Sequence, residues 1–271
     1  MTALDVDQGH PELVFEPSDV DGMREALASA GCFVVRGLFD REAVKRARER
    51  AVAVATNFDA KVERGDISGY ENFIAGAYQA GHLPETHLDV PVTTLELFKA
   101  SAYETIATNL FGEASHGFAL RRSHLKGSPN PLGFHQDAFF TEFGYNFWTP
   151  LNDAGVTAPN IELILGSGEP LLSHSAIVDA VLTEQYLRQC YGHQTFWHPI
   201  LSAGDVLVFS TFIMHRTRQT PEMTGERYSI EIRGPIKAPV EIAGVPSDPS
   251  AAKLLNSITE LPDFLVQAKC G

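Results

Sequence analysis

The first part of the chain follows a helical spacing of apolar and polar positions, interrupted by one short apolar run. Residues from Ser18 to Ala30 predict a helix, because Met23 and Leu27 lie four apart. Ser18 is placed to cap this helix and Gly31 to end it. The run at 32–35, Cys-Phe-Val-Val, then predicts a short buried strand.

Two more helices and an irregular segment follow. Asp40 is placed to cap a helix from Arg41 to about Ala55. A third helix is expected from Thr94 to Leu110, ended by Gly112. Between them, residues 59–92 are broken by several Gly and Pro. Such a segment in a compact domain is often a lid or binding loop, and we expect a lid here.

From Gly117 the pattern changes to short apolar stretches separated by Gly, Pro and Asn, which is typical of strands in a sandwich or barrel. Helices first and strands second predict an α+β chain with one all-β core. A helix around Val178–Cys190 and a closing helix within Ser250–Ala268 are also expected. The expected strands are Phe118–Lys126, Gly133–Phe140, Tyr145–Leu151, Ile161–Leu165, Thr195–Leu201, Asp205–Ser210 and Tyr228–Arg233.

Composition narrows the possible partners. Apolar residues make up 44% of the 271 residues and charged residues 20%, an ordinary globular balance. The net charge of −13 argues against a nucleic-acid or anionic-membrane binder, since both need a basic surface. The three cysteines show no Cys-x-x-Cys spacing, and no signal peptide or membrane-length apolar stretch is visible. We expect a soluble, cytoplasmic protein acting on a small molecule; the pattern predicts no oligomeric state.

The chemistry lies in a His-x-Asp pair and a distant histidine. His135 and Asp137 are two apart on an expected strand, so their side chains would share one face. His215 can join them only if the fold returns the chain to the same point. Two imidazoles and one carboxylate suit non-haem Fe(II), with coordination positions left open. The same pair can instead be an orienting hydrogen bond, and the same three residues can hold zinc and activate water.

The order of the surrounding motifs resembles the phytanoyl-CoA dioxygenase-like family of Fe(II)/2-oxoglutarate-dependent oxygenases. The resemblance covers roughly residues 117 to 235. The matching pieces are Phe134-His135-Gln136-Asp137, Asn146-Phe147-Trp148-Thr149-Pro150-Leu151, Ala203-Gly204-Asp205-Val206-Leu207-Val208-Phe209, His215 and Arg227-Tyr228-Ser229-Ile230.

The resemblance implies a single oxygenase domain over residues 1–271. Its core, residues 117–235, would be a double-stranded β-helix, the jelly roll of cupin-like proteins. Residues 1–116 would be helical support with the lid, and 236–271 a tail. The implied cofactor is Fe(II), with 2-oxoglutarate and O2 as cosubstrates. Conversion of 2-oxoglutarate to succinate and CO2 would accompany oxidation, most simply hydroxylation, of an unactivated C–H bond.

The resemblance also implies a place for the distal carboxylate of 2-oxoglutarate. Arg227 lies where the family carries an arginine for this carboxylate, and the planar guanidinium can pair with it bidentately. Ser229 would share the strand face of Arg227 and donate a hydrogen bond to the same group. Arg233 is the rival arginine. Since a zinc hydrolase or a cupin-like binding module needs no carboxylate clamp, Arg227 with Ser229 favours the oxygenase.

Other candidate site residues are supported less directly by the matching motifs. Asn146, Thr217 and His124 are expected near the cosubstrate or the metal, and Trp148 and Arg122 near the substrate. Trp148 can equally be core, and Arg122 a solvated cation on the sheet. The family's Pro-Gly-Ser-His run is replaced by Leu165-Gly166-Ser167-Gly168, and His174 is the alternative to the missing histidine. Because related halogenases lack the carboxylate ligand, Asp137 disfavours halogenation.

Overall fold

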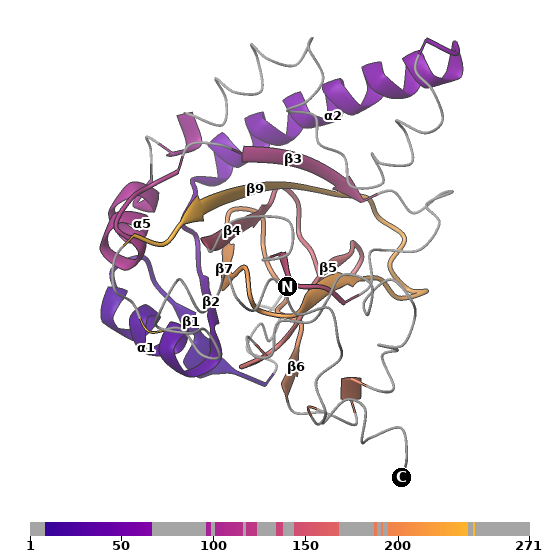
Figure 1. The fold of residues 1–271 in the computed structure, drawn as a ribbon. Coiled ribbons are helices and arrows are strands. Elements are labelled where there is room, and N and C mark those ends of the chain that lie inside the picture. The colour runs from indigo at the N-terminus through magenta and orange to yellow at the C-terminus, as the bar shows by residue number, and fades with distance from the viewer. Residues whose placement is uncertain are drawn as a thin grey trace, which may run out of the picture.

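The computed structural model describes residues 9–66, 96–98, 101–115, 118–123, 134–137, 144–167, 187–188, 191, 195–237 and 241. The expected tail helix, most of the Val178–Cys190 helix and residues 67–92 of the expected lid lie outside these ranges. Mixed helices and strands confirm an α+β chain (Figure 1). The elements are η1 (Pro11–Leu13), β1 (Val14–Phe15), α1 (Val20–Ala30), β2 (Cys32–Val35), α2 (Arg41–Glu63), α5 (Tyr103–Phe111), β3 (Phe118–Ser123), β4 (Gly144–Pro150), β5 (Asn160–Ile164), β6 (Phe196–Trp197), β7 (Val206–Ser210), β8 (His215–Arg218) and β9 (Arg227–Pro235).

The N-terminal helices match the sequence pattern except at their ends. The cap of α1 is Asp19 instead of Ser18, because the Asp19 carboxylate accepts a hydrogen bond from the Gly22 N–H at 3.0 Å. Gly31 ends α1 with φ of 78°, as predicted. Asp40 caps α2 through the Ala43 N–H. The helix continues to Glu63, well past Ala55, since no Gly or Pro interrupts the chain before residue 65.

Six strands form a large sheet in the order β1-β2-β7-β4-β9-β3, and three form a small sheet in the order β6-β5-β8. All neighbours pair antiparallel except β1 and β2. From β3 onward the chain contributes to both sheets: β3, β4, β7 and β9 join the large sheet, and β5, β6 and β8 join the small one. His135 forms a single antiparallel bridge to His215 at the start of β8.

The large sheet has one face toward the helices and one toward the small sheet. In Figure 1, α2 runs over β3 and β9, α1 lies beside β1 and β2, and α5 lies next to α1. Tyr103 and Phe111 of α5 pack on Phe147 and Tyr145 of β4, with the Phe111 and Tyr145 rings stacked at 3.9 Å. Because side chains alternate along a strand, this packing turns Asn146 and Trp148 to the opposite face.

The Gly-Asp pair before β7 makes a structural turn. Gly204 has φ of 97°, and a Cβ there would lie 2.6 Å from the Phe39 carbonyl oxygen. The Asp205 carboxylate accepts from the Gly37 and Ser202 N–H groups and pairs with Arg36 at 2.6 Å. This turn therefore ties β7 to the end of β2, and with it the strand that leads toward His215.

Candidate metal and cosubstrate site

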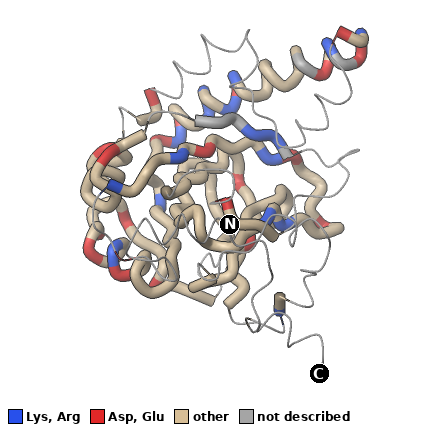
Figure 2. Tube along the Cα trace, in the orientation of Figure 1, with Lys and Arg blue, Asp and Glu red and all other residues tan. Residues whose placement is uncertain are grey.

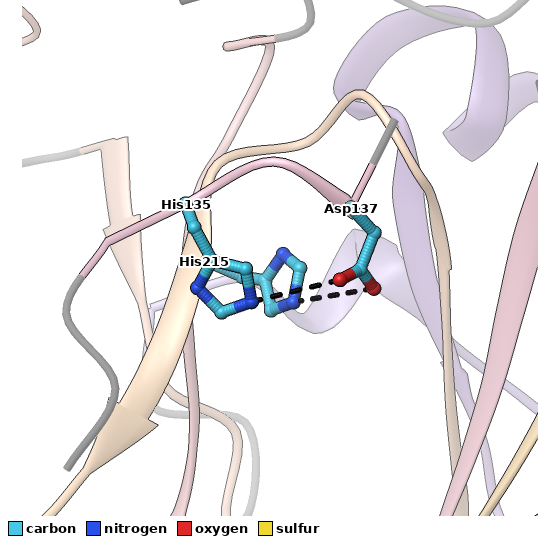
Figure 3. A group of neighbouring side chains, drawn as sticks. All are labelled: His135, Asp137 and His215. Atoms are coloured by element: carbon cyan, nitrogen blue, oxygen red, sulfur yellow. Dashed lines mark ion pairs between the residues drawn. The ribbon is translucent and has the colours of Figure 1, made fainter. Parts of the chain in front are cut away.

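His135, Asp137 and His215 meet between the two sheets. Figure 3 shows both imidazole rings pointing at the Asp137 carboxylate, from the 134–137 segment and from β8. Nε2 of His135 is 3.6 Å from Oδ1, and Nε2 of His215 is 3.6 Å from Oδ2. All three residues are buried, and their ligand atoms lie within 4.8 Å of one another. Since first-row metals sit roughly 2.0–2.2 Å from such atoms, one ion can reach a nitrogen and an oxygen that are 3.6 Å apart.

The main chain brings the two histidines together. The N–H of each donates to the carbonyl oxygen of the other, both at 2.9 Å. Beyond this bridge residues 134–137 are not a strand, which corrects that part of the expected strand at Gly133–Phe140; the rest of that range lies outside the described residues. Asp137 instead follows Gln136, whose side chain anchors the segment. The buried Gln136 amide donates to the Phe212 carbonyl at 2.7 Å and to the Ser167 carbonyl at 3.3 Å.

The region that departs from the family's Pro-Gly-Ser-His run supports the same loop. Ser167 is fully buried, and its hydroxyl accepts from the Met214 N–H at 2.9 Å. The same residue receives the Gln136 amide through its carbonyl. Ser167 therefore links the segments that carry His135 and His215. His174 lies outside the described residues.

Neighbouring groups orient the three ligands. Nδ1 of His215 lies 2.9 Å from the Ile213 carbonyl, which assigns its proton to Nδ1 and leaves the Nε2 lone pair for a metal. The ring of His215 also packs on Phe209 of β7, with centroids 4.7 Å apart. Asp137 Oδ2 accepts from the Asn146 amide at 2.9 Å and pairs with Arg233 at 3.0 Å.

The electrostatics favour the charge states that bind a metal. Burial would raise the pKa of Asp137, but His215, His135 and Arg233 outweigh it and hold this pKa well below its ordinary value. Burial, and then the positive charge that His135 can carry, lower the pKa of His215 to about 4. At neutral pH the site therefore presents an ionised carboxylate and, at His215, a neutral imidazole.

A buried arginine that has no carboxylate partner in the described part of the chain lies on the same face of the large sheet. Arg227 is 4% exposed, and its guanidinium carbon stands 5.1 Å from the centre of the Trp148 ring. Its only hydrogen bond among the described residues is a 3.5 Å contact to the Asn160 carbonyl, and its Nε has none. The Ser229 hydroxyl is also buried without a partner there. Burial, and then Arg121, lower the pKa of Arg227 to about 10, against an opposing effect of Glu231.

The structure places some of the remaining predicted site residues near the cluster and others elsewhere. Asn146 touches the metal-ligating carboxylate, and Trp148 is 1% exposed against Arg227. Thr217 is half-buried on β8, two residues after His215 and paired with Ile161 of β5. His124 lies outside the described residues. Arg122 is on the wrong face for a substrate role: its guanidinium pairs bidentately with Asp59 of α2 at 2.6 and 2.7 Å.

Two contributors to the site were not recognised from the sequence. Gln136 lies inside the matching motif, but a side chain whose partners are backbone carbonyls distant in the chain leaves no pattern in the sequence. Glu231 alternates with Arg227, Ser229 and Arg233 along β9, and period-two spacing alone places it on their face. Arg233 was considered only as a cosubstrate ligand, whereas it pairs with Asp137 and Glu231.

Comparison with solved structures finds the same fold in several proteins. The non-heme monooxygenase ThoJ, in its apo form, aligns over 90% of this chain and 99% of its own, with a TM-score of 0.56 and 13% identity. EvdO2 from Micromonospora carbonacea var. aurantiaca, complexed with 2-oxoglutarate, aligns over 81% and 91%, with a TM-score of 0.51 and 17% identity.

A third similar structure is SnoK, a non-heme alpha ketoglutarate dependent carbocyclase from nogalamycin biosynthesis. It aligns over 78% of this chain and 81% of its own, with a TM-score of 0.52 and 12% identity. No protein-family model matches the chain, and no curated protein sequence is similar enough to match. At these identities the comparisons establish that the chain shares its fold with non-haem oxygenases.

Proposed function

We propose that this protein is an Fe(II)- and 2-oxoglutarate-dependent dioxygenase that hydroxylates an unactivated C–H bond of a small molecule. The observation that carries the proposal is Arg227, a buried guanidinium without a carboxylate partner among the described residues, on the sheet face that also reaches the His135, Asp137 and His215 cluster. A folded protein rarely buries an unpaired charge, so such a group indicates a ligand of opposite charge. The distal carboxylate of 2-oxoglutarate has that charge.

The metal would be held by Nε2 of His135, Nε2 of His215 and the Asp137 carboxylate. Two imidazoles and a carboxylate on one side of an ion are typical of non-haem Fe(II) oxygenases, and three positions stay open for cosubstrates. When bound, iron, 2-oxoglutarate and O2 supply the oxidation: one oxygen atom enters the substrate C–H bond, and the other enters succinate as CO2 is lost. The protein binds and orients these groups.

The cosubstrate would lie between the metal and β9. Arg227 would pair with its distal carboxylate, and the Ser229 hydroxyl would donate a second bond to it. The Trp148 ring holds Arg227 from one side. We also propose that Thr217 and His124 contribute contacts to the cosubstrate and that Asn146 acts on it through Asp137. Arg122 is left out because Asp59 already occupies its guanidinium.

The order of the strands supports a more specific proposal about the fold. The chain crosses between the two sheets several times from β3 to β9, with the His135 bridge in the small sheet between β3 and β4, and this crossing supports a double-stranded β-helix. We propose that residues 117–235 form this jelly roll within one oxygenase domain of the phytanoyl-CoA dioxygenase-like type. The helices before it would be support, and residues 236–271 a tail.

The structural neighbours support the substrate class. ThoJ is described as a non-heme monooxygenase, EvdO2 was crystallised with 2-oxoglutarate, and SnoK is a carbocyclase from nogalamycin biosynthesis. By analogy we propose a biosynthetic tailoring step on a small molecule, in the cytoplasm and without nucleic-acid or membrane partners. No helix among the described residues is long and apolar enough to cross a membrane.

The test is binding followed by turnover. Anaerobic addition of Fe(II) and 2-oxoglutarate should give a weak visible charge-transfer band, and air should then produce succinate that depends on iron. His135→Ala should lose both signals, whereas Arg227→Met should keep metal binding and lose the 2-oxoglutarate band. Arg122→Met, on the opposite sheet face, is the matched control and should keep both signals. A protein that binds zinc, gives no band and forms no succinate would contradict the proposal.

A further inference from the structure

The face of β9 that points to the His135, Asp137 and His215 cluster carries three charged side chains and one serine. Arg227, Ser229, Glu231 and Arg233 alternate with the buried apolar residues of the same strand. Figure 2 shows basic and acidic positions close together on β3 and β9 in the large sheet. Glu231 pairs with Arg121 of β3 at 2.7 Å on one side and with Arg233 on the other. An unbroken chain of ion pairs therefore runs from β3 to Asp137.

The two oxygens of Asp137 have different surroundings. Oδ2 accepts from the Asn146 amide at 2.9 Å and from the Arg233 guanidinium at 3.0 Å. A carboxylate oxygen has two lone-pair sites, so two donors fill the Oδ2 side. Each oxygen also faces one histidine: Oδ1 lies 3.6 Å from Nε2 of His135, and Oδ2 lies 3.6 Å from Nε2 of His215. Because the two donors already engage Oδ2, they favour binding of an ion through Oδ1 and oppose binding through both oxygens.

Arg233 and Arg227 have divided roles on one strand. Arg233 is paired with two carboxylates, those of Asp137 and Glu231. Arg227 has no carboxylate partner among the described residues. The arginine available to a cosubstrate carboxylate is therefore Arg227, and the arginine committed to the metal ligand is Arg233.

We propose that Arg233 is a positioning residue that makes Asp137 a one-oxygen metal ligand, with Glu231 and Arg121 holding the guanidinium in place. This inference rests on the proposed function, because it assumes that Asp137 binds the metal. Partners of metal ligands fix ligand orientation, and their loss typically weakens metal binding 10- to 100-fold. Holding Asp137 to one oxygen also keeps open the position that its second oxygen would fill.

The experiment titrates Co(II) alone into the metal-free protein and records the visible d–d bands, whose intensity reports coordination number. Arg233→Gln should weaken Co(II) binding roughly 10- to 100-fold and lower the band intensity as the carboxylate becomes bidentate. Arg233→Lys keeps the charge and should restore most of the affinity. Arg122→Gln removes a buried ion pair on the other face of the sheet and should leave the Co(II) spectrum unchanged.

A second variant tests the same inference with a milder change. Glu231→Gln keeps Arg233 but loosens it, and should shift the Co(II) spectrum in the same direction by less. If Arg233→Gln does not fold, this variant carries the test. Native affinity with an unchanged spectrum in the folded variants would overturn the inference. If the wild-type protein binds Co(II) at His135, Asp137 and His215 but does not bind 2-oxoglutarate, only the proposed function is refuted. The Co(II) comparison still measures the effect of Arg233 in that case.

Discussion

Replacing Arg227 by Met should stabilise the metal-free protein while destroying its cosubstrate site. Burial and Arg121 lower the pKa of this guanidinium from its ordinary value to about 10. Each unit of pKa corresponds to about 1.4 kcal/mol, so keeping Arg227 charged at neutral pH costs the folded state about 3 kcal/mol. Met keeps most of the packing on Trp148 and removes the charge.

The expected gain is smaller than this cost, because the variant loses the cation–π contact with Trp148 and the long bond to Asn160. We expect the free energy of unfolding to rise by about 1–3 kcal/mol, which is roughly 2–10 °C in Tm for a chain of this size. Urea unfolding of the metal-free protein measures it. Arg122→Met is the opposite case. Burial lowers the pKa of Arg122, but its pairing with Asp59 outweighs burial and raises this pKa, so removing the partnered cation should destabilise the folded protein.

A second measurement compares how much 2-oxoglutarate stabilises the wild-type protein and the Arg227→Met variant. With Mn(II) under anaerobic conditions, 2-oxoglutarate at about 100 times its Kd should stabilise the wild-type protein by about 2.7 kcal/mol. The Arg227→Met variant should gain none of this. The reasoning fails if Arg227→Met lowers the stability of the metal-free protein by more than about 1 kcal/mol, or if 2-oxoglutarate stabilises the variant as it does the wild type.

Three further substitutions test separate contacts. Ser229→Ala removes a buried hydroxyl without a described partner, so the Kd for 2-oxoglutarate, measured by calorimetry with Mn(II), should rise about tenfold without loss of Tm. Gln136→Met removes the hydrogen bonds to the Phe212 and Ser167 carbonyls; the free energy of unfolding should fall by about 1–3 kcal/mol and metal binding should weaken at least about 10-fold, and native metal affinity would refute the anchoring role. Gly204→Ala forces a Cβ against the Phe39 carbonyl at φ of 97° and should cost about 1–3 kcal/mol in urea unfolding, whereas Gly37→Ala, where a Cβ meets nothing, is the control for φ alone.

The sequence could identify the ligands because their chemistry is carried by residue type. His135, Asp137 and His215 were named from side-chain chemistry and order, and the fold brings them together. The prediction that one strand carries both His135 and Asp137 is only partly right, because His135 makes a single bridge and Gln136 anchors the segment through its side chain. A one-residue bridge and an anchoring side chain give no periodic signal, so only the long-range contacts could reveal them.

Arg122 shows the other limit of sequence reasoning. Its place on an expected strand predicts a contact with substrate or a solvated position, but the sequence pattern does not tell which face of the sheet Arg122 lies on. The face was decided by Asp59, which lies 63 positions earlier in the chain on a helix predicted to have ended near Ala55. An error in one helix boundary thus hid the partner that gives an arginine its role.

The paired backbone hydrogen bonds between His135 and His215 bear on how such a protein can change. Because main-chain groups join the two ligand-bearing segments, this contact does not depend on the side chains that face the substrate. Residues that face the substrate can then be exchanged without disturbing this contact. A scaffold built in this way suits directed evolution toward new substrates, with the loops varied and the bridge left intact.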